Sequence, residues 1–243
     1  MSHKVYVGDS IELKEEANQK VNFKGYFNPN KIMKEWNFKE LALDETNQYT
    51  KFIDTTSAVA LANGGITLTT AATNTKTCSY AFGALRVLCA KNPVVEFKLQ
   101  LDVITTVAVN AVLTDALTEA SGALPFTISG TTISDTATDA VGFCLDTEQT
   151  TDRYYIVNTA TGTQGGTLLS AAEAPWVAAT DITVRIMLDT SGNAKYFYNE
   201  RQVGYKATAV TSTVALAPYV AIRNNSAAAH VLTLRYVRLW EDV

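Results

Sequence analysis

The sequence feature that most constrains the fold is a strict alternation of apolar and polar side chains in two segments. In Val94 to Val103 the odd-numbered positions are Val, Phe, Leu, Leu and Val, and the positions between them carry Glu, Lys, Gln and Asp. Ile182 to Leu188 repeats this pattern. Side chains two residues apart lie on the same face of a strand. Both segments are therefore predicted to be strands with one face in a core and the other in water.

Further short apolar runs are separated by turn residues such as Asn63-Gly64-Gly65 and the segment Asp189 to Asn193. The remaining predicted strands are Ile66 to Thr70, Cys78 to Cys89, Val141 to Asp146, Arg153 to Asn158, Lys195 to Tyr198, Gln202 to Lys206, Pro218 to Arg223 and His230 to Trp240. Many short strands joined by turns predict an all-β fold, a two-sheet antiparallel β-sandwich of the jelly-roll type.

Two local signals qualify this prediction. Weak helical periodicity occurs in Ile32 to Leu43 and in Val109 to Ala120, so we expect helix only in one or two short segments. In the last predicted strand the apolar side chains change face between Leu234 and Val237. That change predicts a β-bulge near Arg235-Tyr236.

Composition divides the chain into an N-terminal arm, residues 1–35, and a β-sandwich domain, residues 36–243. The arm is rich in Lys, Glu and Asn and has only short apolar runs. Within the sandwich domain, residues 104–140 form a Thr/Ala-rich insertion. Two interpretations of this insertion stay open, namely additional short strands with their connections, or a protruding loop used for recognition.

Charge and hydropathy exclude several partners. The chain has 20 Lys and Arg against 24 Asp and Glu, with the two signs interspersed, which argues against nucleic-acid binding. No apolar stretch approaches the roughly 18 residues of a membrane span. The first residues, MSHKVYVGDSIELKEE, lack the apolar core of a secretory signal, so we expect folding in the cytosol. Cys78, Cys89 and Cys144 are an odd number without metal-ligand spacing, and are predicted to be buried free thiols.

The second half of the chain resembles the concanavalin A-like superfamily of laminin-G-like modules, lectins and glucanases. The segments that carry this resemblance are VGFCLD, DRYYIVN, ITVRIMLDTSGNAKYFYNERQVG, PYVAIRN and LTLRYVRLW. The resemblance implies the sandwich fold over residues 141–240, and over most of the chain if residues 36–103 supply the earlier strands. Because these motifs are short and apolar, it implies little about function.

The residues argue against catalysis. Glucanases of this superfamily carry two carboxylates about 5–5.5 Å apart. The nearest candidates, Glu96 and Asp102, are six residues apart on one strand, which separates them by about 20 Å. His3 and His230 are too few for a triad or a multi-histidine metal site. We therefore predict no enzyme activity, no catalytic or metal site and no cofactor.

Several loop carboxylates are candidate calcium ligands. The pairs Asp146 with Asp152 and Asp181 with Asp189 could join a calcium site, but they lack the dense spacing of calcium loops. Solvated turn acids are the simpler interpretation. One residue suggests ligand contact: Trp176 lies in a Pro-Trp loop, where it could stack on a sugar or pack over one end of the sandwich.

Taken together, these features favour a non-enzymatic structural protein of a virus or phage. Such a protein would be a capsid decoration, cement or fibre-type subunit, located in the virion and assembled in the host cytoplasm. Its arm would contact capsid or other virion proteins by strand addition, and it would be a homo-oligomer with a surface glycan as a further partner. The alternatives are a carbohydrate-binding, lectin-like module outside a virion and a degenerate glycoside hydrolase.

Overall fold

A computed structural model describes residues 4–7, 10–14, 20–21, 31–36, 38, 49–62, 64–83, 85–117, 123–175 and 177–243. Within these residues, three short strands of the N-terminal segment pair in the order β1-β2-β3: β1 (Lys4–Val7), β2 (Ser10–Lys14) and β3 (Lys20–Val21). This pairing does not test which partners the arm contacts or whether the protein is a homo-oligomer, so both remain predictions.

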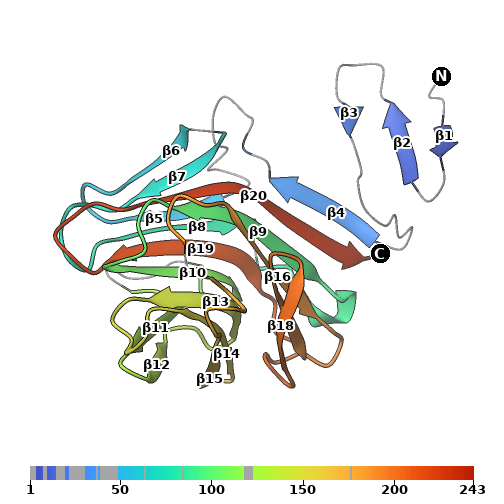
Figure 1. The fold of residues 1–243 in the computed structure, drawn as a ribbon. Coiled ribbons are helices and arrows are strands. Elements are labelled where there is room, and N and C mark those ends of the chain that lie inside the picture. The colour runs from blue at the N-terminus through green and yellow to red at the C-terminus, as the bar shows by residue number, and fades with distance from the viewer. Residues whose placement is uncertain are drawn as a thin grey trace.

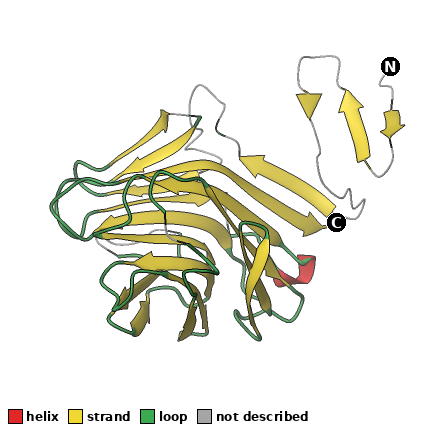
Figure 2. Cartoon of the chain, in the orientation of Figure 1, coloured by secondary structure: helices red, strands yellow, loops and turns green. Residues whose placement is uncertain are grey.

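The described body is a sandwich of two antiparallel sheets (Figures 1 and 2), as predicted. The seven-stranded sheet has the order β15 (Thr163–Leu168), β14 (Tyr154–Ala160), β13 (Ala140–Asp146), β10 (Val107–Thr114), β19 (Ala217–Asn224), β8 (Thr77–Phe82), β5 (Tyr49–Ile53). The eight-stranded sheet has the order β18 (Arg201–Lys206), β17 (Ala194–Tyr198), β16 (Ile182–Leu188), β9 (Val94–Leu101), β20 (Val231–Asp242), β7 (Gly65–Thr69), β6 (Ala58–Ala62), with β4 (Lys31–Trp36) paired to β20.

The main core fills the space between the sheets. The alternating strands behave as their patterns predict: Val95, Phe97 and Leu99 of β9 are buried, and so are Val184 and Ile186 of β16. The pairing of β20 with β9 shifts register between Leu234 and Tyr236. This irregularity confirms the predicted bulge.

The weak helical signals at Ile32 to Leu43 and Val109 to Ala120 are wrong for residues 32–36 and 109–114, whereas residues 39–43 and 118–120 lie outside the described residues. Residues 31–36 form β4, and residues 107–114 form β10, a central strand of the seven-stranded sheet. Every residue of β10 is buried, because both faces of the strand are covered, so its sequence does not alternate. Within the described residues the helical structure is one 3₁₀ turn, Cys89–Lys91. No helix of the described residues is long and apolar enough to cross a membrane.

Residues 104–140 contain β10 and a hairpin of β11 (Phe126–Ser129) and β12 (Thr132–Asp135). The hairpin lies on the outer face of the seven-stranded sheet, where Phe126 and Ile128 form a second core with small side chains of the sheet. That face of the sheet is therefore closed at the hairpin. β4 lies on the N-terminal side of the predicted domain boundary at residue 36, yet it pairs with β20.

Asn110 of β10 holds the hairpin in place. Its Nδ2 donates to the carbonyl of Phe126 at 3.0 Å, and its Oδ1 accepts from the backbone N–H of Phe126 at 2.8 Å. Asn110 is fully buried, so both halves of its amide need partners, and Phe126 supplies them. The neighbouring Asp146 likewise accepts from the N–H of Ile128 at 3.0 Å.

Candidate functional site

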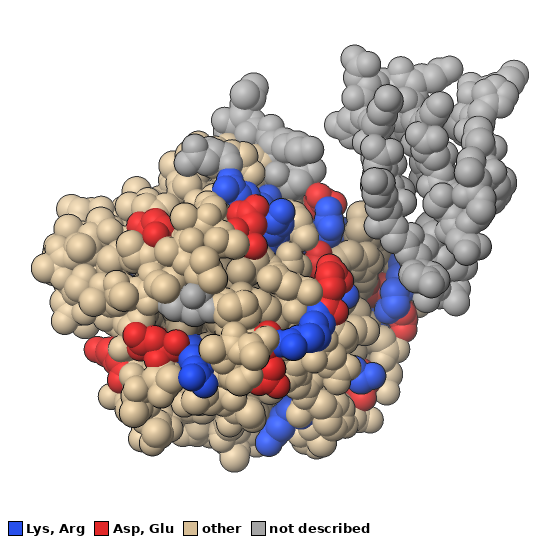
Figure 3. Space-filling view, in the orientation of Figure 1, with Lys and Arg blue, Asp and Glu red and all other residues tan. Residues whose placement is uncertain are grey.

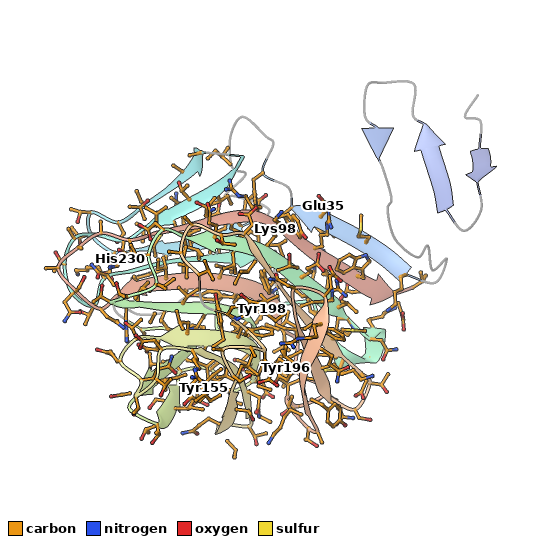
Figure 4. All side chains as sticks on the ribbon, in the orientation of Figure 1. Glu35, Lys98, Tyr155, Tyr196, Tyr198 and His230 are labelled. Carbon is orange, nitrogen blue, oxygen red and sulfur yellow. The ribbon has the colours of Figure 1, made fainter. Side chains whose placement is uncertain are left out.

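A polar pocket of about 40 Å³ lies where both sheets end, between the β14–β15 pair and the β17–β18 pair. β15 and β18 are the terminal strands of their sheets, so the pocket opens at an edge of the sandwich. Figure 4 labels Tyr155 of β14 and Tyr196 of β17 in this region. By volume it has room for a few water-sized groups, which is enough for one substituent of a larger ligand.

The wall of the pocket is set by close contact between the sheets. Tyr196 crosses from β17 and donates its hydroxyl to the carbonyl of Val157 at 3.3 Å. Gly204 of β18 allows Ile156 of β14 to approach, because a Cβ at Gly204 would be 2.4 Å from the Ile156 Cδ1. Burial raises the pKa of Tyr196 far above its usual range, so this hydroxyl stays a neutral donor.

Asn158 of β14 is the buried polar group of the pocket. It lines the pocket two residues after Ile156, and its side chain is only 6% exposed. No hydrogen bond joins its amide to another described residue, although buried amides normally have partners. Its amide can therefore bind a group that enters the pocket.

The rim of the pocket is exposed. Thr167 of β15 contributes a hydroxyl, and Tyr205 and Lys206 of β18 lie on the opposite side. Tyr205 is 55% exposed, which is unusual for an aromatic side chain in a folded domain. Aromatic rings next to hydroxyl and amide groups suit ligands that have both apolar faces and polar edges.

The carboxylate singled out in the sequence, Glu96, has a different role. It is 3% exposed and lies in a row of residues that are opposite one another on neighbouring strands: Glu35, Arg238, Glu96 and Arg185. Arg185 contacts Glu96 at 2.7 Å, the Tyr236 hydroxyl donates to it at 2.9 Å, and Arg238 lies 3.7 Å away. We call this set the charged row.

Every close partner of Glu96 belongs to the charged row or is Tyr236. Its oxygens are held by two guanidinium groups and a phenol, and burial together with the charge of Glu96 raises the pKa of Tyr236 to about 12. Asp102, the other candidate, lies past the end of β9, and its Oδ1 accepts from the N–H of Val103. Basic and acidic groups lie side by side over much of the visible face in Figure 3.

Asp146 and Asp189, two of the candidate calcium ligands, have internal partners. Asp146 accepts from Ile128, Glu148 and Asn225 and pairs with Arg223. Asp189 accepts from the backbone and side chain of Asn193, and hydrogen bonds lower its pKa. Among the described residues, no group of three or more His, Cys, Asp or Glu could hold a metal ion.

His230 makes contacts that could be mistaken for a catalytic dyad. Its Nε2 lies 3.1 Å from Thr106 Oγ1 and 3.4 Å from Ser226 Oγ, while its buried Nδ1 has no hydrogen-bond partner among the described residues. We place the proton on Nε2, because an N–H buried without an acceptor costs more than a bare lone pair. In this tautomer Nε2 donates to the neighbouring hydroxyl oxygens.

The candidate sites of the sequence thus do not coincide with the pocket. Trp176, the predicted ligand contact, lies outside the described residues. Asn158 was included only as the end of the predicted strand Arg153 to Asn158. The sequence did offer one signal for Asn158. It follows the apolar run Tyr154 to Val157, and its parity places it on the inward face of the strand together with Tyr154 and Ile156. All three cysteines are free and buried, as predicted.

Comparison with solved structures shows the fold. A β-glucanase of Bacillus licheniformis matches with a TM-score of 0.58 at 11% identity over 85% of this chain and 97% of that chain. The carbohydrate recognition domain of Emp47p matches with a TM-score of 0.55 at 10% identity over 81% and 90%. The κ-carrageenase of Pseudoalteromonas carrageenovora, solved with a κ-carrageenan oligosaccharide, matches with a TM-score of 0.53 at 11% identity over 89% and 98%.

The chain therefore has the concanavalin A-like lectin and glucanase fold, as its motifs suggested. No protein-family model matches the sequence, and no curated protein does. These neighbours contradict the predicted role as a virion structural protein, because they are glycoside hydrolases and carbohydrate recognition domains. The virion prediction rested on the lack of a signal peptide, the free thiols, the Thr/Ala-rich composition, the arm and the missing catalytic chemistry. The last of these is equally expected of a domain that binds sugars through neutral polar groups.

Proposed function

We propose that this chain is a carbohydrate-binding module without catalytic activity, and that it binds sugar at the pocket between β14–β15 and β17–β18. The observation that carries the proposal is Asn158, a buried residue that lines the pocket and whose amide has no hydrogen-bond partner among the described residues. Sugar hydroxyls both donate and accept hydrogen bonds, as does an amide, so a sugar substituent can satisfy both halves of the Asn158 side chain.

The rest of the pocket fits this ligand class. Tyr205 and Lys206 of β18 line the pocket together with Thr167 and Asn158, and Tyr205 is exposed at its rim. The neighbours support the proposal because their names include lectin domains and enzymes that act on polysaccharides. At these identities the likeness supports the sugar class only through the shared fold.

The absence of catalysis is part of the proposal. The buried carboxylate of the eight-stranded sheet is held by Arg185 and Tyr236, and the outer face of the seven-stranded sheet is occupied by the β11–β12 hairpin. A retaining hydrolase needs a free nucleophile and an acid about 5–5.5 Å apart on an accessible surface. The charged row and the covered face offer no such pair.

The test combines a glycan array with calorimetric titration of the best ligands. We expect binding by the intact protein, loss of at least tenfold in affinity in Asn158→Leu and in Thr167→Val, and no change in Lys98→Met. Lys98 lies on β9 away from the pocket lining and pairs with Asp181. Unchanged binding in both pocket variants would refute the site. Release of new reducing ends from a bound polysaccharide would refute the non-catalytic role.

A further inference from the structure

The pocket is lined by hydrogen-bond donors and one cation, and this points to the class of sugar. Asn158 can present its amide N–H groups, Thr167 its hydroxyl and Lys206 its ammonium group. No Asp or Glu is among the lining residues. A neutral sugar would leave the ammonium group without a matching charge.

Lys206 differs from the cations of the eight-stranded sheet's outer face. Lys98, Arg185 and Arg238 each have a carboxylate within ion-pair distance. In the part of the chain that the structure describes, no carboxylate pairs with Lys206, and no other interaction of its side chain is present. Its charge is thus available to a ligand.

Size restricts what can enter. About 40 Å³ admits a few water-sized groups, so a carboxylate or sulfate fits and a whole sugar ring does not. The ring of the same sugar would remain outside, at the rim that Tyr205 and Thr167 form. Hydrogen bonds to a charged acceptor are shorter and about twice as strong as neutral ones.

We infer that the pocket binds the anionic substituent of an acidic glycan, either a uronate carboxylate or a sulfate ester. This inference rests on the proposed sugar-binding function. Lys206 supplies the charge, Asn158 and Thr167 supply directed donors, and the sugar ring lies against the rim. On the outer face of the eight-stranded sheet, Lys98, Arg185 and Arg238 are by contrast already paired with carboxylates.

The experiment uses polymers matched in backbone and different in charge. Polygalacturonate is compared with its methyl ester, and a sulfated galactan with the desulfated polymer, by calorimetric titration against the full chain. We expect at least tenfold weaker binding of each neutral polymer. The affinity for the charged polymers should fall as salt rises from about 0.05 to 0.5 M, because screening weakens an exposed charge pair. The two charged arms show whether carboxylate or sulfate is the natural group.

Lys206→Met keeps the aliphatic stem and removes the charge, and should reduce binding of the charged polymer to the level of its neutral counterpart. Lys98→Met is the matched control and should leave it unchanged. Equal affinity for charged and neutral polymers, with no effect of Lys206→Met, would overturn the acidic class while Asn158→Leu still tests the site. No binding to any glycan would overturn the proposed function itself.

Discussion

Two of the buried asparagines of the seven-stranded sheet, Asn110 and Asn158, lie in different regions and differ in their partners. Asn110 lies under the β11–β12 hairpin and exchanges two hydrogen bonds with the backbone of Phe126. Asn158 lies in the edge pocket, almost as buried, and no described residue bonds its amide. The first amide has a structural role, because leaving its partners unsatisfied would destabilise the fold. The second is the amide that we propose binds a ligand. Burial alone does not separate the two roles, whereas the presence of partners does.

The largest expected loss of stability is that caused by truncating a side chain of the second core, between the β11–β12 hairpin and the seven-stranded sheet. Phe126 is fully buried in the second core, so Phe126→Ala should lower the free energy of unfolding by about 3–5 kcal/mol, measured by urea denaturation. Glycan binding is not the readout for this variant, because Ile133 of the hairpin packs against Gly166, which lines the pocket. A loss below about 1 kcal/mol would show that the hairpin is not part of the cooperative core.

Asn110→Leu removes the two hydrogen bonds between the Asn110 amide and the Phe126 backbone without leaving a large cavity. The N–H of Phe126 would lose its partner, and its carbonyl would keep only the weak thiol donor of Cys144 at 3.8 Å. At about 1–3 kcal/mol for each unsatisfied group, we expect a loss of about 2–3 kcal/mol. Thermal and urea unfolding measure it. An unchanged midpoint would break the comparison, because Asn110 would then be no more structural than Asn158.

The charged row extends the comparison to ionised groups. Arg185→Leu leaves the buried Glu96 with Tyr236 at 2.9 Å and with Arg238 at 3.7 Å. Removing one partner of a buried charge costs several kcal/mol, and the remaining partners should limit the loss to about 2–3 kcal/mol. The control is Lys98→Met in the more exposed pair with Asp181, which should cost under about 1 kcal/mol. Equal losses in the two variants would contradict the role given to burial.

Asn158→Leu should have a small effect on stability. Because its amide bonds no described residue, an apolar side chain of similar size should change the free energy of unfolding by less than about 1 kcal/mol. The same variant should lose glycan binding. A destabilisation as large as that of Asn110→Leu would show that Asn158 is structural.

The smallest effect is an expected lack of thiol reaction. Burial raises the pKa of Cys89 to about 11, that of Cys78 to about 12 and that of Cys144 well above its usual range. Since the thiolate is the reactive form, iodoacetamide at pH 8 should leave the folded protein unmodified and label all three cysteines in denaturant. Mass spectrometry counts the adducts.

The same thiols test the comparison between Asn110 and Asn158, and they make the free energy of unfolding depend on pH. Cys144 lies 3.5 Å from the Asn110 amide, so Asn110→Leu should expose it to labelling first, whereas Asn158→Leu should not.

Unfolded thiols ionise from their ordinary pKa of 9.0, while the folded ones stay protonated. The free energy of unfolding should therefore decrease as the pH rises from about 9 towards 11. Constant stability across that interval would contradict the raised pKa values.

Much of the fold was predictable because it follows from local pattern. The alternation in Val94 to Val103 determined which side chains of β9 face the core, and the change of face after Leu234 located the bulge in β20. β10 was partly misread as helix, because a strand buried on both faces has no alternation. The free, buried cysteines followed from their number and spacing.

The site was not predictable to the same extent. The sequence by itself determined strand positions, the inward and outward faces and the absence of familiar catalytic motifs. Only the tertiary structure decided which polar groups have partners: Glu96 meets Arg185 and Arg238 from strands 89 and 142 positions away in the chain, whereas Asn158 meets none among the described residues. The physical reason is that the period of a strand determines the face of each side chain, while its neighbours depend on register between strands far apart in sequence.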